Sequence, residues 1–176
     1  TGIKRAKSGG IPLAFFQEKT YTIAILWSKV EQMGAPSPVG GGSDKMTGTY
    51  LHNLDAKGRL FVPANFREEL GTCFYIAVGA NREADGTLYQ YLNVYPMPEW
   101  DRLCEKLAAL PSSKAAISDT FFANAAKCEP DSQNRFMIPK KLRDYAGLEK
   151  EVAIVGNNKK AKIWNAEVWK AKDEAA

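Results

Sequence analysis

The feature that most constrains the fold of this chain is a segment that occurs twice. DAKGRLFVPANFRE, residues 55–68, recurs without a gap as DSQNRFMIPKKLRD, residues 131–144. Both copies keep an acid, a base, an apolar run, a proline and a second base in the same order. The identical positions are Asp55/Asp131, Arg59/Arg135, Pro63/Pro139 and Arg67/Arg143. Duplication of a supersecondary unit is the simplest explanation of this pattern.

The residues around the first copy predict a β-hairpin. Residues 49–54 alternate loosely between apolar and polar, which indicates a strand, and residues 60–62 predict the returning strand. Between them, Asp55 offers a carboxylate to nearby backbone N–H groups, and Gly58 adopts a left-handed conformation at low cost. We therefore expect residues 50–62 to form one hairpin.

A short helix follows in each copy. Pro63 cannot donate to a strand ladder and suits the first turn of a helix, which we expect over residues 64–70 with Gly71 at its end. In the second copy, Pro139 and Gly147 occupy the corresponding places. The repeat therefore includes a junction between a strand and a helix as well as a turn.

The remaining segments complete two βαββα-like units. The expected strands cover residues 73–78 and 87–95 in the first copy, with a turn-rich stretch at residues 79–86, and residues 152–155 and 161–164 in the second. Three further helices are expected: one from Pro98 with Trp100, Leu103, Leu107 and Leu110 on one stripe, one from Ser112 or Ser113 into Ala126, and one after Asn165.

The charge of the chain argues against bulk attraction to an anionic partner. The chain has 176 residues, a formal net charge of +4 and a pI near 8.9. Most of the excess positive charge lies in residues 1–45, so the body that contains the repeats is close to neutral. Any anion-binding role of this body must come from the local placement of basic side chains.

The cysteine and histidine content favours a reducing cytoplasm. Three widely spaced cysteines and one histidine form neither a zinc set nor a disulfide framework. We find no pattern for an activated nucleophile, a carboxylate pair or a phosphate-binding loop, and we expect no enzyme activity, no metal and no cofactor. The apolar stretch at residues 22–27 is far shorter than the roughly 20 residues of a membrane span, so we expect no membrane partner.

Residues 1–45 differ from the rest of the chain. They end in a stretch rich in Gly, Pro and Ser, residues 34–45, which is typical of a flexible connector. We interpret Met46 as the natural start and the preceding segment as a tag, a fusion piece or an upstream translated extension. The alternative is an N-terminal arm whose first basic residues contact phosphates.

The repeated Asp-x-x-x-Arg motif carries the chemistry of most interest. In a tight turn the aspartate accepts hydrogen bonds from backbone N–H groups, and the arginine emerges where the returning strand begins. The planar guanidinium of Arg59 or Arg135 matches O6 and N7 of guanine. The motif by itself leaves an alternative open, an internal Asp–Arg ion pair that only holds the turn together.

Other basic residues near the two motifs are candidates for phosphate contacts. They are Lys57, Lys140, Lys141 and Arg143. Contacts of this kind position a protein on DNA without recognising its sequence. For Arg143 and its counterpart Arg67, a solvated helix face or a pair with the adjacent acidic residue is the favoured interpretation.

From residue 46 to about residue 172 the chain resembles the MraZ family of bacterial transcriptional regulators, which is associated with the division and cell-wall gene cluster. The likeness rests on MTGTYLHNLDAKGRLFVPANFREEL, on the helix with Trp100, on FFANAAKCEPDSQNRFMIPKKLRDYAGLEKEVAIVG and on the closing tryptophans. The resemblance implies an α+β, mainly β fold. In this fold two tandem swapped-hairpin AbrB-like β-barrel half-units form an intrachain pseudo-dimer with short peripheral helices.

The repeat and the resemblance together divide the chain into three segments. Residues 1–45 have no counterpart in the family and form an extension with a flexible linker. Residues 46–111 are the first AbrB-like repeat with its helix, and residues 112–176 are the second.

The resemblance also implies a function. The DNA-binding motif of the family falls on Asp55 and Arg59 in the first copy and on Asp131 and Arg135 in the second. The implied partners are double-stranded promoter DNA with direct repeats and further copies of the chain in a ring-shaped homo-oligomer, in the cytoplasm at the nucleoid. One departure is Asn134, which stands where the family usually has glycine. The rival hypothesis is a ring-forming assembly protein without specific DNA recognition.

Overall fold

The structure of this chain is a computed structural model that describes Ile25 and residues 46–175. Its strands are β1 (Thr49–Asn53), β2 (Arg59–Phe61), β3 (Phe74–Arg82), β4 (Leu88–Pro96), β5 (Ala125–Cys128), β6 (Arg135–Met137), β7 (Glu151–Asn157) and β8 (Lys160–Asn165). Its helical segments are the 3-10 helices η2 (Ala64–Phe66) and η3 (Ser112–Lys114) and the α-helices α2 (Arg67–Leu70), α3 (Met97–Ala108), α4 (Ala115–Ala123), α5 (Lys140–Ala146) and α6 (Ala166–Ala175).

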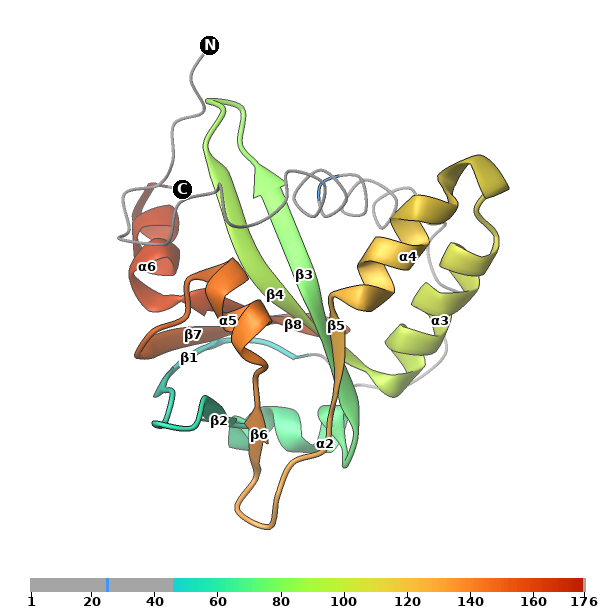
Figure 1. Cartoon of the computed structure of the whole chain (residues 1–176). Helices are drawn as coiled ribbons and strands as arrows, with labels where there is room; N and C mark the ends of the chain where they lie inside the picture. The colour runs from blue at the N-terminus through green and yellow to red at the C-terminus, as the bar shows by residue number, and fades with distance from the viewer. Residues whose placement is uncertain (1–24, 26–45, 176) are drawn as a thin grey trace.

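Two sheets organise these elements (Figure 1). Six strands form an antiparallel sheet in the order β1-β7-β8-β4-β3-β5, and β2 pairs with β6 in a separate two-stranded sheet, which we call the β2–β6 ribbon. Helices α3 and α4 lie together on one side of the molecule, and α6 lies on the opposite side. The described residues thus have an α+β fold that is mainly β, which confirms the prediction at this level.

Prolines and one asparagine set the starts of the helices. Pro63 precedes η2 and α2, and Pro139 precedes α5, as the repeat predicts. The side-chain oxygen of Asn165 accepts hydrogen bonds from the backbone N–H groups of Glu167 (3.0 Å) and Val168 (3.2 Å). This confirms the predicted cap of the C-terminal helix, because such a bond satisfies an N–H group that has no partner inside the helix.

Strands of each repeat pair with strands of the other, so the prediction of a hairpin over residues 50–62 is wrong beyond its turn. The turn itself forms, but β1 leaves it to pair with β7, and β2 pairs with β6. Leu60 is opposite Phe136 in the β2–β6 ribbon, and both side chains are buried. Pairing between repeats therefore brings an apolar residue of each copy into one core, which a local hairpin does not achieve.

Two further segments differ from the predicted pattern. The stretch at residues 79–86 was expected to be a turn, but β3 continues through Gly79 to Arg82. A Cβ atom on Gly79 would meet Tyr91, so glycine is needed there for ring packing rather than for chain reversal. Ala125 and Ala126 belong to β5 and pair with β3 instead of ending a helix. Short runs of alanine have no periodicity that separates the two states.

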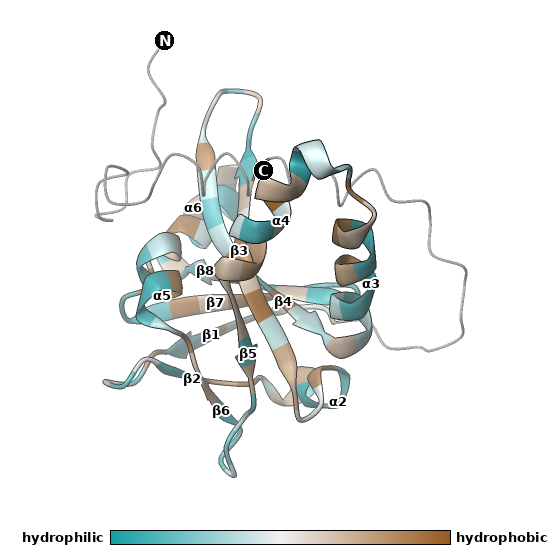
Figure 2. Cartoon of the chain, turned by 45° about the vertical axis from the view of Figure 1, so that its right-hand side comes forward, coloured by the Kyte–Doolittle hydropathy of each residue, from teal (hydrophilic) through white to brown (hydrophobic). Residues whose placement is uncertain are grey.

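The core contains most of the aromatic residues that occupy equivalent places in the two repeats. Tyr95, Trp100 and Trp164 are buried, and Trp100 stacks on Tyr75 with ring centroids 4.2 Å apart. These three aromatics are therefore packing residues. Figure 2 shows apolar colouring on the strands near the centre of the molecule, whereas the two repeated turns at its lower edge are hydrophilic.

The predictions for residues 1–45 lie outside the described residues, apart from Ile25. Ile25 is half-buried and packs against the main core. In the described part of the chain, none of the helices combines the length and the apolar character that a transmembrane segment requires.

Candidate nucleic-acid interface

The β2–β6 ribbon brings the two repeated turns together at one end of the molecule. Both turns lie at the end away from the tip that joins β3 to β4 (Figures 1 and 2). The carbonyl of Gly58 accepts the N–H of Ile138 at 3.0 Å, and the carbonyl of Asn134 accepts the N–H of Val62 at 2.9 Å. Each turn is therefore bonded to the strand end of the other repeat, in a two-fold arrangement.

The first aspartate holds its turn through three hydrogen bonds. One carboxylate oxygen of Asp55 accepts the backbone N–H groups of Lys57 and Arg59, both at 2.9 Å. The other oxygen accepts the side-chain Nε of Arg59 at 2.6 Å. The carboxylate therefore fixes both the backbone of the turn and the direction of the arginine.

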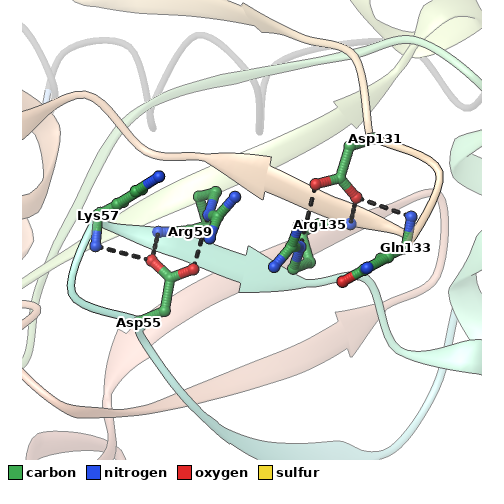
Figure 3. A network of polar contacts seen from close by, with 6 residues as sticks. All are labelled: Asp55, Lys57, Arg59, Asp131, Gln133 and Arg135. Carbon is green, nitrogen blue, oxygen red and sulfur yellow. Dashed lines mark hydrogen bonds and ion pairs between the residues drawn. The ribbon is translucent and has the colours of Figure 1, made fainter.

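The second aspartate makes the same set of bonds (Figure 3). One oxygen of Asp131 accepts the backbone N–H groups of Gln133 at 2.9 Å and Arg135 at 3.0 Å. The other accepts Nε of Arg135 at 3.0 Å. The two arginines lie between the two aspartates on neighbouring strands. The motif is thus duplicated in geometry as well as in sequence.

Hydrogen bonding lowers the pKa of both carboxyl groups. For Asp55 the largest cause is the backbone N–H of Arg59, and for Asp131 it is the backbone N–H of Arg135. Burial raises the pKa of each carboxyl but does not outweigh these bonds. Both aspartates are therefore ionised at neutral pH, and each carries its arginine as an ion pair.

Each ion pair leaves part of its guanidinium available. Among the described residues, Arg59 and Arg135 use only Nε of the side chain in hydrogen bonds. Their side chains are 26% and 23% exposed. The Nη atoms are thus the ones that can donate to an acceptor outside the chain, in the bidentate geometry that suits guanine.

A left-handed residue closes each turn. Gly58 has φ +77° and Asn134 has φ +58°. Asn134 stands where the resemblance predicts glycine, and it preserves the turn. Asparagine tolerates this conformation better than most residues with a side chain.

Helix α5 places Arg143 against the turn of the other repeat. Its guanidinium lies so close to Gly58 that a Cβ atom there would come within 2.6 Å of Cζ. Its Nε donates to the carbonyl of Ile138 at 2.9 Å, and Asp144 pairs with Lys140 at 2.6 Å. The interpretation of Arg143 as a solvated side chain or a partner of Asp144 is therefore wrong. In the first repeat, Nε of Arg67 donates to a carbonyl in the same way.

The predicted phosphate-contacting lysines lie on or beside the same end. Lys57 is exposed in the first turn, and Lys140 and Lys141 are exposed at the start of α5. In the first repeat the positions equivalent to the two α5 lysines are Ala64 and Asn65. Because α5 contacts the first turn through Arg143, basic side chains are more numerous around that turn than around the second.

Sequence reasoning missed two residues of this surface. Phe61 and Met137 are 44% and 57% exposed on the ribbon. In the sequence they belong to the apolar run of each copy. The signal that identifies them is the alternation on each strand, since Leu60 and Phe136 between them and the arginines are buried.

In residues 46–175 the structure gathers no group of three or more His, Cys, Asp or Glu side chains that could hold a metal ion. The chemistry that the ribbon offers is that of guanidinium, ammonium and apolar side chains on a polar surface.

Comparisons with known proteins agree with the resemblance. The model of a family described as "MraZ protein, putative antitoxin-like" matches residues 46–119 and 121–175. A protein of Heliobacterium modesticaldum named Transcriptional regulator MraZ is 45% identical over 132 residues, which cover 73% of this chain and 87% of that relative. A relative of the same name from Carboxydothermus hydrogenoformans is 46% identical over 125 residues, which cover 69% of this chain and 82% of the relative. This chain therefore belongs to the MraZ family.

Proposed function

We propose that this chain is a transcriptional regulator that binds double-stranded DNA through the β2–β6 ribbon. The observation that carries the proposal is the pair of arginines, each fixed through Nε by an aspartate, on the exposed side of a two-stranded ribbon. The major groove of DNA admits a ribbon of this kind. The curated relatives are named transcriptional regulators, which supports the regulatory role.

The roles within the motif follow from its hydrogen bonds. Arg59 and Arg135 donate from their Nη atoms to O6 and N7 of guanine. Asp55 and Asp131 do not contact DNA; they hold the arginines in place, which reduces the conformational entropy lost on binding. Lys57, Lys140, Lys141 and Arg143 contact phosphates and fix the orientation of the ribbon.

We further infer that the two repeats form the intrachain pseudo-dimer of an AbrB-like swapped-hairpin barrel. The matching bonds of the two turns, each to the strand end of the other repeat, support it. On this view several chains form a ring at the nucleoid and bind promoter direct repeats of the division and cell-wall gene cluster. Because the repeat-containing body is almost neutral, simultaneous binding by several chains supplies much of the affinity.

A gel-shift assay with DNA from upstream of the gene for this chain tests the proposal. We expect Arg59→Ala and Arg135→Ala each to weaken retention roughly 5-fold to 150-fold, because a bidentate base contact is worth about 1–3 kcal/mol. The double variant should not retain the DNA, and its oligomer mass should be unchanged. Arg102→Ala is the matched control, since it removes an exposed arginine of α3.

Normal retention by the double variant contradicts the proposal. Salt dependence separates it from a ring that serves only assembly. A DNA-binding ring loses affinity steeply as salt rises, whereas an assembly ring retains no specific DNA at any salt concentration.

A further inference from the structure

The ribbon exposes two large apolar side chains between its arginines. Arg59, Phe61, Arg135 and Met137 are the residues of the ribbon that point away from the core, and we call them the outer face. Leu60 and Phe136, which alternate with them, are 0% and 4% exposed. Phe61 and Met137 are 44% and 57% exposed, although burial of either would be favourable. Their exposure requires an explanation.

In the strand register of the ribbon, each arginine of the outer face lies opposite an apolar residue. Arg59 lies opposite Met137, and Phe61 lies opposite Arg135. Residues directly opposite each other in an antiparallel pair have Cβ atoms about 4.5–5.5 Å apart. Successive bases on one strand are about 3.4 Å apart. An arginine and its apolar partner therefore reach the same base or the next one.

The major groove presents one apolar group, the C5-methyl of thymine. We propose that Phe61 and Met137 contact thymine methyl groups next to the guanines bound by the arginines. Phe61 contacts the thymine beside the base bound by Arg135, and Met137 contacts the thymine beside the base bound by Arg59. This inference rests on the proposed function, because it requires the ribbon to lie in the major groove.

The composition of the outer face favours DNA over a protein partner. An apolar protein surface that covered Phe61 and Met137 would also cover the Nη atoms of two arginines, which the ion pairs through Nε do not use. Burying a hydrogen-bond donor without an acceptor is costly. The major groove supplies guanine acceptors and thymine methyl groups side by side. A single DNA segment thus satisfies both kinds of side chain on the outer face.

The contacts of Phe61 and Met137 differ in how strongly they discriminate for thymine. The phenylalanine ring is rigid, whereas methionine has three rotatable bonds and adapts to irregular surfaces. We expect Phe61 to discriminate more strongly for thymine than Met137. The two halves of the site are therefore not equivalent, although the arginines are.

Replacement of thymine by deoxyuridine, which lacks only the methyl group, tests the inference directly. The wild-type protein first selects a duplex from a random library, and footprinting identifies the bases that it protects. Each protected thymine is then replaced in turn by deoxyuridine. We expect at least one replacement near a protected guanine to weaken wild-type binding about fourfold, the effect of one buried methyl group. Phe61→Ser should bind the thymine and deoxyuridine forms of the affected duplex equally, and Met137→Ser should do so at its own position.

Phe122→Ser is the matched control. Phe122 on α4 is 41% exposed, close to the value for Phe61, but it lies outside the ribbon. This variant should keep the wild-type preference for thymine. Its loss of that preference overturns the assignment to the outer face.

The outcomes separate this inference from the function on which it rests. Equal wild-type binding to every thymine and deoxyuridine duplex overturns the inference, and so does a selected site without thymine. If the double variant of Arg59→Ala and Arg135→Ala still fails to retain the DNA in those cases, the proposed function stands. A smaller oligomer mass for Phe61→Ser overturns the inference in favour of a subunit contact. Failure of the wild-type protein to select any sequence overturns both.

Discussion

At the scale of single residues, the ion pair and the proposed recognition of DNA use different nitrogen atoms of each arginine. Asp55 engages Nε of Arg59, and the same holds for Asp131 and Arg135. The sequence left two interpretations open, an internal ion pair and an arginine that binds bases. The geometry makes them compatible, because an arginine held through Nε keeps its Nη atoms for a second acceptor.

The pKa of Asp55 gives a prediction about pH. Its folded-state pKa lies below the ordinary value of 3.8, mainly because the backbone N–H of Arg59 donates to the carboxylate. A lowered folded-state pKa stabilises the fold above the unfolded-state pKa, and this contribution is lost as the pH falls through the folded-state pKa. Titration of the Asp55 carboxyl carbon by NMR, with Asp55→Asn for assignment, should show a midpoint below 3.8. A midpoint at or above that value contradicts the hydrogen-bond geometry.

At the scale of elements, the turn is a local property and the strand pairing is not. The turn of residues 55–59 closes through its own bonds, including the N–H of Gly58 to the carbonyl of Asp55 at 3.0 Å. Those bonds are encoded by Asp55 and Gly58, which is why the sequence predicts them. The partner of β2 is decided by burial of Leu60 and Phe136 in a shared core.

The two turns predict responses of different size to substitution. We expect Gly58→Ala to lower the free energy of unfolding by about 1–2 kcal/mol, the cost of a left-handed conformation for most residues. Displacement of Arg143 adds to this cost, because the new Cβ would meet its guanidinium. Asn134→Gly, at the equivalent position, should change the free energy of unfolding by less than about 1 kcal/mol. Urea denaturation measures both, and equal effects would contradict the assigned turn geometry.

The start of α5 predicts a change in salt dependence. The double variant Lys140→Ala and Lys141→Asn installs the residues that the first repeat has at Ala64 and Asn65. Each phosphate contact contributes about 0.9 to the slope of log K against log salt, so the slope should become shallower by roughly 1–2. Lys140 also pairs with Asp144, which favours the lower end of this range. The control is Lys172→Ala on α6, outside the ribbon, which should leave the slope unchanged. An unchanged slope for the double variant contradicts the proposal that Lys140 and Lys141 contact phosphates.

At the scale of the whole molecule, the two sequence repeats are parts of one structural unit. β1 of the first repeat pairs with β7 of the second, and β5 of the second pairs with β3 of the first. The hydroxyl of Tyr145 donates to the carbonyl of Gly79 in the buried interior at 2.9 Å. Separation of the repeats would break backbone hydrogen bonds and expose core residues of both.

We therefore expect neither repeat to fold by itself. Fragments of residues 46–111 and 112–176 should each give the poorly dispersed NMR spectrum of an unfolded chain, because their strands lose partners from the other half. Mixing the fragments should restore strand content in far-UV circular dichroism. A well-dispersed spectrum from one fragment alone contradicts this expectation.

Much of the candidate site follows from the sequence, because its key bonds are short in sequence. Asp55 and Arg59 are four residues apart, so their contact depends on one turn and recurs wherever that turn recurs. The contact of Arg143 with Gly58 depends on how distant segments pack. No spacing in the sequence specifies this contact.

The sequence by itself determined the repeat, the two aspartate-held turns, the helices that start after Pro63 and Pro139, and membership of the MraZ family. These features rest on hydrogen bonds between near neighbours and on the fixed backbone of proline. Only the tertiary structure decided that strands of one repeat pair with strands of the other and that the two turns lie on one ribbon. That outcome depends on which apolar residues share a core, and burial acts without regard to separation along the chain.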